Sequence, residues 1–380
     1  MADHITHDAI YDTVDRDDFA SMIDPARYAE RTEAFDQIIS LTRDHHWDPN
    51  DPAYVDYDAV PFDTSEETIM PRDFIVELNC AVADRLDEGQ QIQLANESTR
   101  FSLSSILHGE QGAFSLSASL VHILRDPGAQ EYAANQAREE ARHVAGFSKY
   151  IQKRWGAPIA CGSTLATLMN ELVLAPEVYK KLVGMQMLIE GLAMGAFATF
   201  HARTNDPLLR RVVQLTMADE AFHHRFGKIW ADRTVPKLTE EEHERVEDWA
   251  AKCFQTLLFN LVNAEQKQAI YPQFGLEWQW VRGAIMEAFT DDDRRRMMRE
   301  STNIFRVLIK TLLKAGIITE RTKPLYASWV DMDELRAEPD EVAGMEVADA
   351  TVAELREINA KNTKLISKAL KRDARSAASA

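Results

Sequence analysis

Residues 136–150 read QAREEARHVAGFSKY, and this stretch carries a carboxylate and an imidazole at metal-ligand spacing. Glu140 and His143 are three residues apart, so on a helix both side chains lie on one face, about one turn apart. A second stretch, DEAFHH, repeats this spacing with Glu220 and His223. Carboxylate oxygen and imidazole nitrogen together suit iron or manganese. The two stretches therefore predict two helices that present ligands to one metal site.

Two further glutamates complete a set of candidate ligands. Glu110 lies 30 residues before Glu140, and Glu190 lies 30 residues before Glu220. A helix breaker stands midway in each interval, DPG in the first and NDP in the second. A turn at the midpoint folds two helices antiparallel and brings residues equidistant from it to the same height. Because a di-metal four-helix bundle takes one Glu from each of two helices and Glu-x-x-His from each of two others, we predict six ligands: Glu110, Glu140, His143, Glu190, Glu220 and His223.

A third Glu-x-x-His pair, Glu240 and His243, shows that the motif alone is weak evidence. Thr239 and Glu242 have the spacing of a capping box, which places this pair at the solvated start of a helix. No glutamate with a midpoint turn precedes it in the sequence. We therefore expect this pair to bind no metal.

Each ligand glutamate of the two motifs directly follows another acid, Glu139 in the first and Asp219 in the second. Metal-bound imidazoles usually donate their remaining N–H to a carboxylate. The position one residue before the ligand would let each acid reach the histidine of the other helix. Arg142 would then bridge the two acids. Thr216, one turn before Glu220, is a candidate hydroxyl beside the site.

The composition limits the classes of function. The chain has 380 residues and a net charge of −18, which argues against binding nucleic acid or an anionic membrane. Its three cysteines are scattered and show no CxxC, so a disulfide framework or a zinc site is not expected and a reducing compartment is favoured. The N-terminus lacks the apolar segment of a signal peptide, and the most apolar stretch, 185–200, is short for a membrane span. We expect a soluble, cytoplasmic protein.

The chain divides into a loop-rich arm (1–75), a di-metal four-helix bundle (76–235), additional packing helices (236–335) and a C-terminal tail (336–380), all in one globular domain. We expect helices at 25–43, 74–87, 91–124, 131–155, 164–173, 176–204, 207–233, 239–265, 274–289, 291–315 and 352–370. The long interval between His143 and Glu190 fits the crossover of a ferritin-like topology. The predicted fold is therefore all-α, a ferritin-like four-helix bundle with flanking helices.

Glycine and methionine are frequent around Glu190, and two explanations are open. Gly184, Gly191 and Gly195 could leave space for a substrate or dioxygen beside the metal. They could equally allow close packing between helices.

The two motifs resemble those of the ferritin-like di-iron carboxylate superfamily. EEARH at 139–143 is similar to the EExRH of plant-type acyl-carrier-protein desaturases, and DEAFH at 219–223 is similar to their DExxH. The resemblance covers about residues 90–232 and extends to bacterial di-iron monooxygenases, arylamine N-oxygenases and the small subunit of class I ribonucleotide reductase. It implies two iron ions, or a manganese and an iron, held by the six ligands, with dioxygen as co-substrate.

No single subfamily matches every position. Reductase small subunits usually carry a radical tyrosine four residues after the first histidine, where this chain has Phe147. The N-oxygenases have a third histidine where this chain has Thr216, and desaturases and monooxygenases have a threonine where it has Ala193 and Met194.

The resemblance leaves three functions open. The first is a dioxygen-activating oxidoreductase, in which a homodimer receives electrons from a ferredoxin or a reductase and hydroxylates, desaturates or N-oxidises a small apolar compound. The second is a radical-generating subunit with a Mn/Fe or Fe/Fe centre. The third is a ferroxidase or iron-storage protein, although this chain is much longer than ferritin or rubrerythrin.

Overall fold

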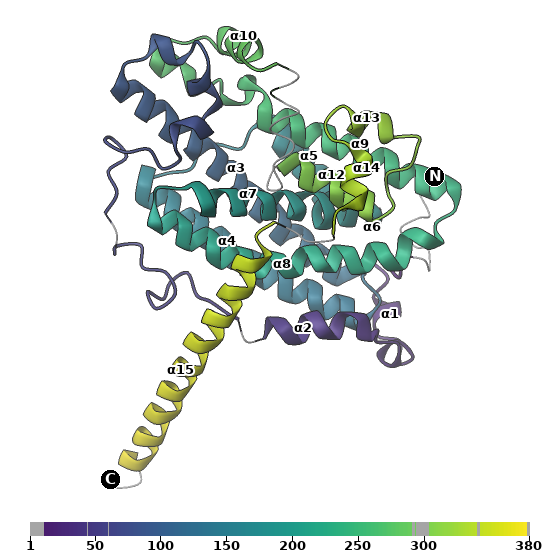
Figure 1. Cartoon of the computed structure of the whole chain (residues 1–380). Helices are drawn as coiled ribbons and strands as arrows, with labels where there is room; N and C mark the ends of the chain where they lie inside the picture. The colour runs from purple at the N-terminus through teal and green to yellow at the C-terminus, as the bar shows by residue number, and fades with distance from the viewer. Residues whose placement is uncertain are drawn as a thin grey trace.

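The computed structural model describes residues 11–43, 45–59, 61–290, 293, 304–339 and 343–377 (Figure 1). The side chains of 260–262, 304 and 364–377 are not described. Within the described part the secondary structure is helical, apart from an isolated bridge between Thr13 and Leu124. The prediction of an all-α fold is confirmed.

Four long helical segments form the centre of the molecule. They are α3 (Glu88–Ile123), α4 (Pro127–Trp155), a continuous segment made of α6 (Val178–Lys181), the π-helical η7 (Leu182–Ile189) and α7 (Glu190–Arg203), and α8 (Pro207–Thr234). Helix α3 packs along α4, and α7 packs along α8. Contacts of α4 with α8 and of η7 with α3 join the two pairs.

The predicted midpoint turns are present, and each one also caps the helix that follows it. Asp126 accepts hydrogen bonds from the amides of Gly128 and Ala129, and Pro127 is the first residue of α4. Asp206 accepts from the amide of Leu208, and α8 likewise begins with a proline. An N-cap carboxylate satisfies amides that have no partner within the helix, and proline is favoured at the first helical position. The turns thus fix the heights at which the candidate ligands face each other.

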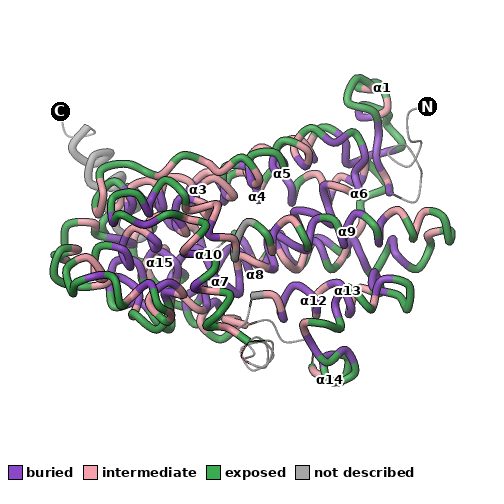
Figure 2. Tube along the Cα trace, turned by 90° about the horizontal axis from the view of Figure 1, so that it is seen from above, coloured by how far each residue is buried: buried purple, intermediate pink, exposed green. Residues whose placement is uncertain are grey.

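Further helices cover this centre. They are α1 (Phe19–Met22), α2 (Asp36–Thr42), α5 (Ser163–Leu174), α9 (Glu240–Val262), α10 (Trp278–Ala288), α12 (Ile304–Lys314), α13 (Lys323–Ala327), α14 (Met332–Ala337) and α15 (Met345–Ala377). Helix α2 contacts α4 and α8, α5 contacts α3, and α12 contacts α7. Buried residues, purple in Figure 2, recur along these helices. Most form one large core that includes residues of the N-terminal arm, and those of α10 belong to a second, smaller core.

Several helix predictions were wrong in extent. The expected helix at 74–87 is a series of 3-10 turns, η4 (Arg72–Phe74), η5 (Val76–Asn79) and η6 (Ala83–Arg85), because Ile75 and Cys80 have extended backbone angles that interrupt it. The expected helix at 25–43 is broken into η2 (Arg27–Ala29), η3 (Glu33–Phe35) and α2. Much of the stretch 291–303 lies outside the described residues.

The helix near the C-terminus is longer than predicted. Helix α15 begins well before the predicted start at 352, packs on α8 with its first half and then extends away from the body (Figure 1). Asn359 donates to the carbonyl of His46 and accepts from the hydroxyl of Tyr54. Helix α15 therefore fastens the N-terminal arm to α8.

The segment Val178–Arg203 is long and apolar enough to span a membrane by length and composition alone. However, 83% of its most apolar window is buried inside the protein, as in a core helix. The described part of the chain contains one such segment.

Candidate metal centre

The six predicted ligands meet in the middle of the four segments. Glu110 comes from α3, Glu140 and His143 from α4, Glu190 from the first turn of α7, and Glu220 and His223 from α8. They form two groups of four, in each of which one ligand atom per residue lies within 4.8 Å of the others. The first group is Glu110, Glu140, His143 and Glu220, and the second is Glu140, Glu190, Glu220 and His223. All six side chains are buried.

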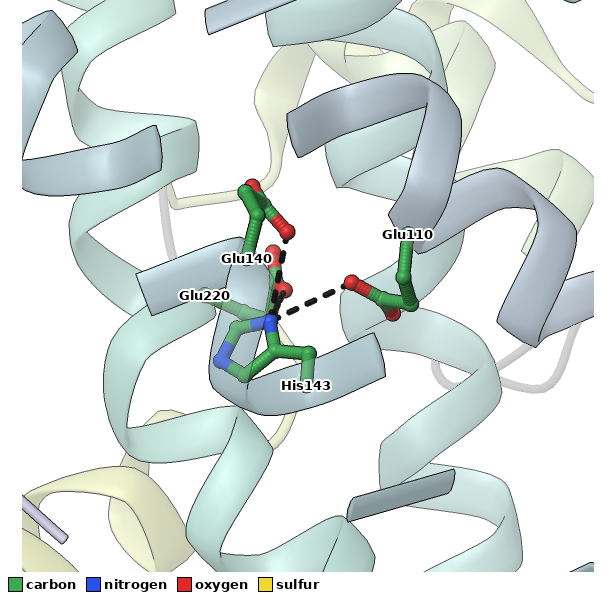
Figure 3. A group of neighbouring side chains, drawn as sticks. All are labelled: Glu110, Glu140, His143 and Glu220. Carbon is green, nitrogen blue, oxygen red and sulfur yellow. Dashed lines mark hydrogen bonds and ion pairs between the residues drawn. The ribbon is translucent and has the colours of Figure 1, made fainter. Parts of the chain in front are cut away.

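Each histidine turns its Nδ1 atom toward three carboxylates. His143 Nδ1 lies 3.2 Å from Glu110, 3.3 Å from Glu140 and 3.1 Å from Glu220 (Figure 3). His223 Nδ1 lies 3.1 Å from Glu140, 3.2 Å from Glu220 and 3.8 Å from Glu190. Glu140 and Glu220 face both histidines, so these two carboxylates are shared by the two groups of candidate ligands.

A proton on the histidine Nδ1 would stabilise the surrounding carboxylates less well than a metal cation would. One N–H can serve only one or two acceptors well, whereas each Nδ1 faces three carboxylates. Glu220 Oε1 is buried, and its 3.1 Å contact with His143 Nδ1 does not have the geometry of a hydrogen bond. Buried carboxylates are costly unless they are paired or coordinate a metal. The ligand set therefore fits a pair of divalent cations.

The acidic residue before each candidate ligand glutamate contacts the histidine of the opposite helix, as its position in the sequence predicts. His143 Nε2 lies 2.9 Å from Asp219 Oδ2, and His223 Nε2 lies 2.9 Å from Glu139 Oε2. Arg142 donates to Asp219 from Nε at 3.1 Å and from Nη2 at 2.7 Å, and Nη2 lies 3.5 Å from Glu139. The predicted bridge between the two acids is present.

The pKa values of the buried candidate ligands are shifted by the negative charges around them. Burial and the charges of Glu220 and Glu140 raise the pKa of Glu190 well above its ordinary value. Burial, together with the same two charges, also raises the pKa of Glu110 well above its ordinary value. Burial alone would lower the pKa of His223, but Glu140 and Glu220 raise it well above the ordinary value. Raised pKa values of two carboxyl groups and an imidazole in one buried pocket are the effect of closely spaced negative charges.

The N-terminal arm supplies two residues that the sequence reasoning missed. His45 Nε2 lies 3.0 Å from Asp219 Oδ1, and the indole N–H of Trp47 donates to Asp219 Oδ2 at 2.8 Å. The indole ring also stacks near His143, with ring centroids 6.2 Å apart. Nothing in the HHW sequence at 45–47 identifies a partner on α8.

Two glutamines beside the candidate ligands were also not predicted from the sequence. Gln136 Nε2 donates to Glu140 Oε1 at 3.0 Å and to Glu190 Oε1 at 2.9 Å. The amide of Gln186 in turn donates to Gln136 Oε1 at 3.0 Å. Gln136 stands four residues before Glu140, so the i, i+4 spacing could have identified it. Gln186 lies in the π-helical segment, which ends directly before Glu190. Such segments are frequent at functional sites.

Three other predictions have simple outcomes. The Thr216 hydroxyl donates a hydrogen bond to the carbonyl of Val212. This bond lies within α8 and does not reach a candidate ligand. A Cβ at Gly184 would lie 2.2 Å from Leu172 Cδ2, so this glycine serves close packing. The capping box of Thr239 and Glu242 is present.

Comparison of the chain with protein-family models, curated proteins and solved structures gives no match in any of the three. Function is therefore inferred from the chemistry of the site.

Proposed function

We propose that this protein is a di-iron oxidoreductase that uses dioxygen to hydroxylate, desaturate or N-oxidise a small apolar compound. The observation that carries the proposal is the pair of buried ligand groups that share Glu140 and Glu220. Shared carboxylates would hold two cations close enough to act on one dioxygen molecule. Four carboxylates with two imidazoles suit iron or manganese better than softer metals.

We further propose a ferritin-like four-helix bundle for the four long segments. The antiparallel pairs α3/α4 and α7/α8 are joined by a long connection that contains α5. A long crossover between two helix pairs is the connection of ferritin-like folds, in which a Glu comes from each of two helices and Glu-x-x-His from each of the other two.

The chain's own residues would hold the metal ions in a fixed arrangement. Asp219 and Glu139 would accept hydrogen bonds from the Nε2–H groups of the two histidines, which leaves each Nδ1 lone pair directed at the cluster. Gln136 restrains Glu140 and Glu190. When bound, two iron ions would supply the redox chemistry needed to activate dioxygen. Burial of the ligands would limit the access of water to the reacting atoms.

The proposal implies partners. Hydroxylation, desaturation or N-oxidation with dioxygen uses two electrons per turnover, which a ferredoxin or a reductase would deliver. We expect a cytoplasmic homodimer, and the net charge of −18 disfavours nucleic acid and anionic membranes as partners. A large multi-subunit shell in solution would instead favour iron storage.

Substitution of a shared ligand tests the proposal. Glu140→Ala should abolish iron binding, measured by elemental analysis after anaerobic loading with Fe(II), and should abolish product formation. Glu240→Ala is the matched control, because Glu240 and His243 repeat the Glu-x-x-His motif at the exposed start of α9. Full iron content and unchanged product formation in Glu140→Ala would refute the assignment.

A radical-generating subunit is the second candidate, and Tyr132 favours it. Burial raises the pKa of this tyrosine well above its ordinary value, and its hydroxyl has no hydrogen-bond partner within the described structure. Phe147, at the position where a radical tyrosine was considered, stacks against Phe197. A tyrosyl signal in electron paramagnetic resonance that Tyr132→Phe removes, together with equal amounts of manganese and iron, would favour this candidate.

A further inference from the structure

A cavity of about 1030 Å³ lies beside the candidate metal centre. Its walls come from α2, α8, α12, the π-helical segment and the residues that lead into α15. Apolar side chains of α2, the π-helical segment, α8 and α12, and of the residue directly after α12, line it: Ile38, Met187, Ala221, Ile229, Val307 and Ala315. This volume is at the upper end of the range for small-molecule sites, which are typically concave and mostly apolar.

The inner wall of the cavity is formed by neighbours of the candidate ligands. Ala221 follows Glu220 directly, and Met187 stands one turn before Glu190. His224, which follows the ligand His223, also lines the cavity. A molecule in the cavity would therefore contact the helical turns that carry three of the ligands.

Charged side chains line the rest of the cavity, and the positive ones are in excess. They are Arg225, Lys228, Arg306, Lys310 and Lys314 against Asp232, Glu334 and Glu338. Each carboxylate has a cationic partner within the wall. Asp232 lies 3.3 Å from Lys228, Glu334 lies 3.5 Å from Arg306, and Glu338 contacts both Arg306 and Lys310.

Two of these cations have no carboxylate partner among the described residues. Arg225 lies over the ring of Phe222, with its guanidinium carbon 5.7 Å from the ring centroid. Lys314 donates only to main-chain carbonyls, those of Arg336 at 2.9 Å and Glu338 at 2.7 Å. Within the described part of the chain, neither cation has an acidic group at ion-pair distance. Uncompensated positive charge in a cavity is unexpected in a chain of net charge −18.

We propose that this cavity binds an aliphatic carboxylic acid. The carboxylate pairs with Arg225 or Lys314, and the alkyl chain lies over the apolar wall toward Met187 and Ala221. The described lining residues include no Phe, Tyr or Trp, which favours an alkyl body over a planar ring. The identification of this acid as the substrate rests on the oxidoreductase function proposed above, whereas its binding needs no metal.

Calorimetric titration of the metal-free full-length protein with decanoate tests the proposal. Decanoate should bind, and decylamine and decan-1-ol, which share its tail, should bind at least about tenfold more weakly, because a charge-assisted hydrogen bond is lost. Arg225→Gln or Lys314→Met should weaken decanoate binding by a similar factor. Lys237→Met, at an exposed lysine outside the cavity, is the control and should bind decanoate like the wild type.

The outcomes separate this proposal from the oxidoreductase proposal. Equal affinity for decanoate and decylamine, or unchanged decanoate affinity in both variants, would overturn the ligand assignment even if iron binds. Absence of iron binding in the wild type would overturn the oxidoreductase function and leave the decanoate result valid. Thermal unfolding of both variants confirms that a loss of binding is not a loss of fold.

Discussion

His143 Nε2 lies 2.9 Å from Asp219 Oδ2, so the residue directly before one candidate ligand contacts a candidate ligand on the facing helix. The same carboxylate accepts from Trp47 and Arg142 and lies 3.0 Å from His45. Burial alone would raise the pKa of Asp219, but Arg142 and His143 hold it well below the ordinary value. Asp219 thus joins α4, α8 and the N-terminal arm at one buried anion.

Asp219→Asn should weaken metal binding by about 10- to 100-fold, because the orientation and the proton position of His143 would no longer be fixed. The side-chain amide of asparagine would also place an N–H donor next to the side chains that now donate to the Asp219 carboxylate. Competition with a chelator measures the affinity. Asp232→Asn, an exposed site near the end of the same helix, should leave it unchanged. Metal affinity within about twofold of the wild type in Asp219→Asn would contradict the positioning role.

Some contacts of the site followed from the sequence because a regular helix fixes them. Glu140, His143 and the acid one residue before Glu140 lie on one helix, so their relative positions follow from their spacing in the sequence. The place of His45 depends on how an irregular arm crosses α8, and no periodicity encodes that path. The π-helical segment Leu182–Ile189 was also missed, because it differs from an α-helix only in hydrogen-bond register.

Trp47→Phe should lower the free energy of unfolding by about 1–3 kcal/mol, because the buried carboxylate of Asp219 loses one donor. The indole is fully buried, so water cannot replace its N–H. Urea denaturation measures the change. Trp278→Phe is the control, because Trp278 is only partly buried at the start of α10. Equal stability of Trp47→Phe and the wild type would show that the hydrogen bond between Trp47 and Asp219 contributes nothing to stability.

Gly227→Ala should both destabilise the protein and weaken metal binding. A Cβ at this position of α8 would lie 2.7 Å from the carbonyl oxygen of Gln186, which is backbone and cannot rotate away. The displaced segment carries the amide that holds Gln136, and Gln136 holds two ligands. We expect a loss of about 1–3 kcal/mol in the free energy of unfolding, as for other overpacked sites.

Gly283→Ala is the matched control for this substitution. A Cβ at Gly283 in α10 would meet no atom within 4 Å, so alanine there should be neutral or stabilise the protein by up to about 1 kcal/mol. If the two variants behaved alike in denaturation and in iron content, the close approach of α8 to the π-helical segment would have no energetic role.

Lys181 should make stability depend on pH in the alkaline range. Burial, with the charge of Arg16, lowers the pKa of this lysine from 10.5 to about 7. Its Nζ donates to Ser119 Oγ at 3.0 Å and to the carbonyls of Leu172 and Val173 at 3.3 and 2.5 Å. Between pH of about 7 and 10.5 the unfolded chain binds the proton that the folded chain has lost. The free energy of unfolding contributed by Lys181 should therefore rise with pH in this window.

Lys181→Met should be less stable than the wild type throughout, because the two buried carbonyls lose their donor. The stability difference between the two proteins should widen as the pH rises from about 7 to 10, since only the wild type gains from the shifted lysine. Urea denaturation at several pH values measures it, and Lys237→Met should show no such trend. A difference independent of pH would mean that the three acceptors hold Lys181 in its charged form and that burial does not decide its pKa.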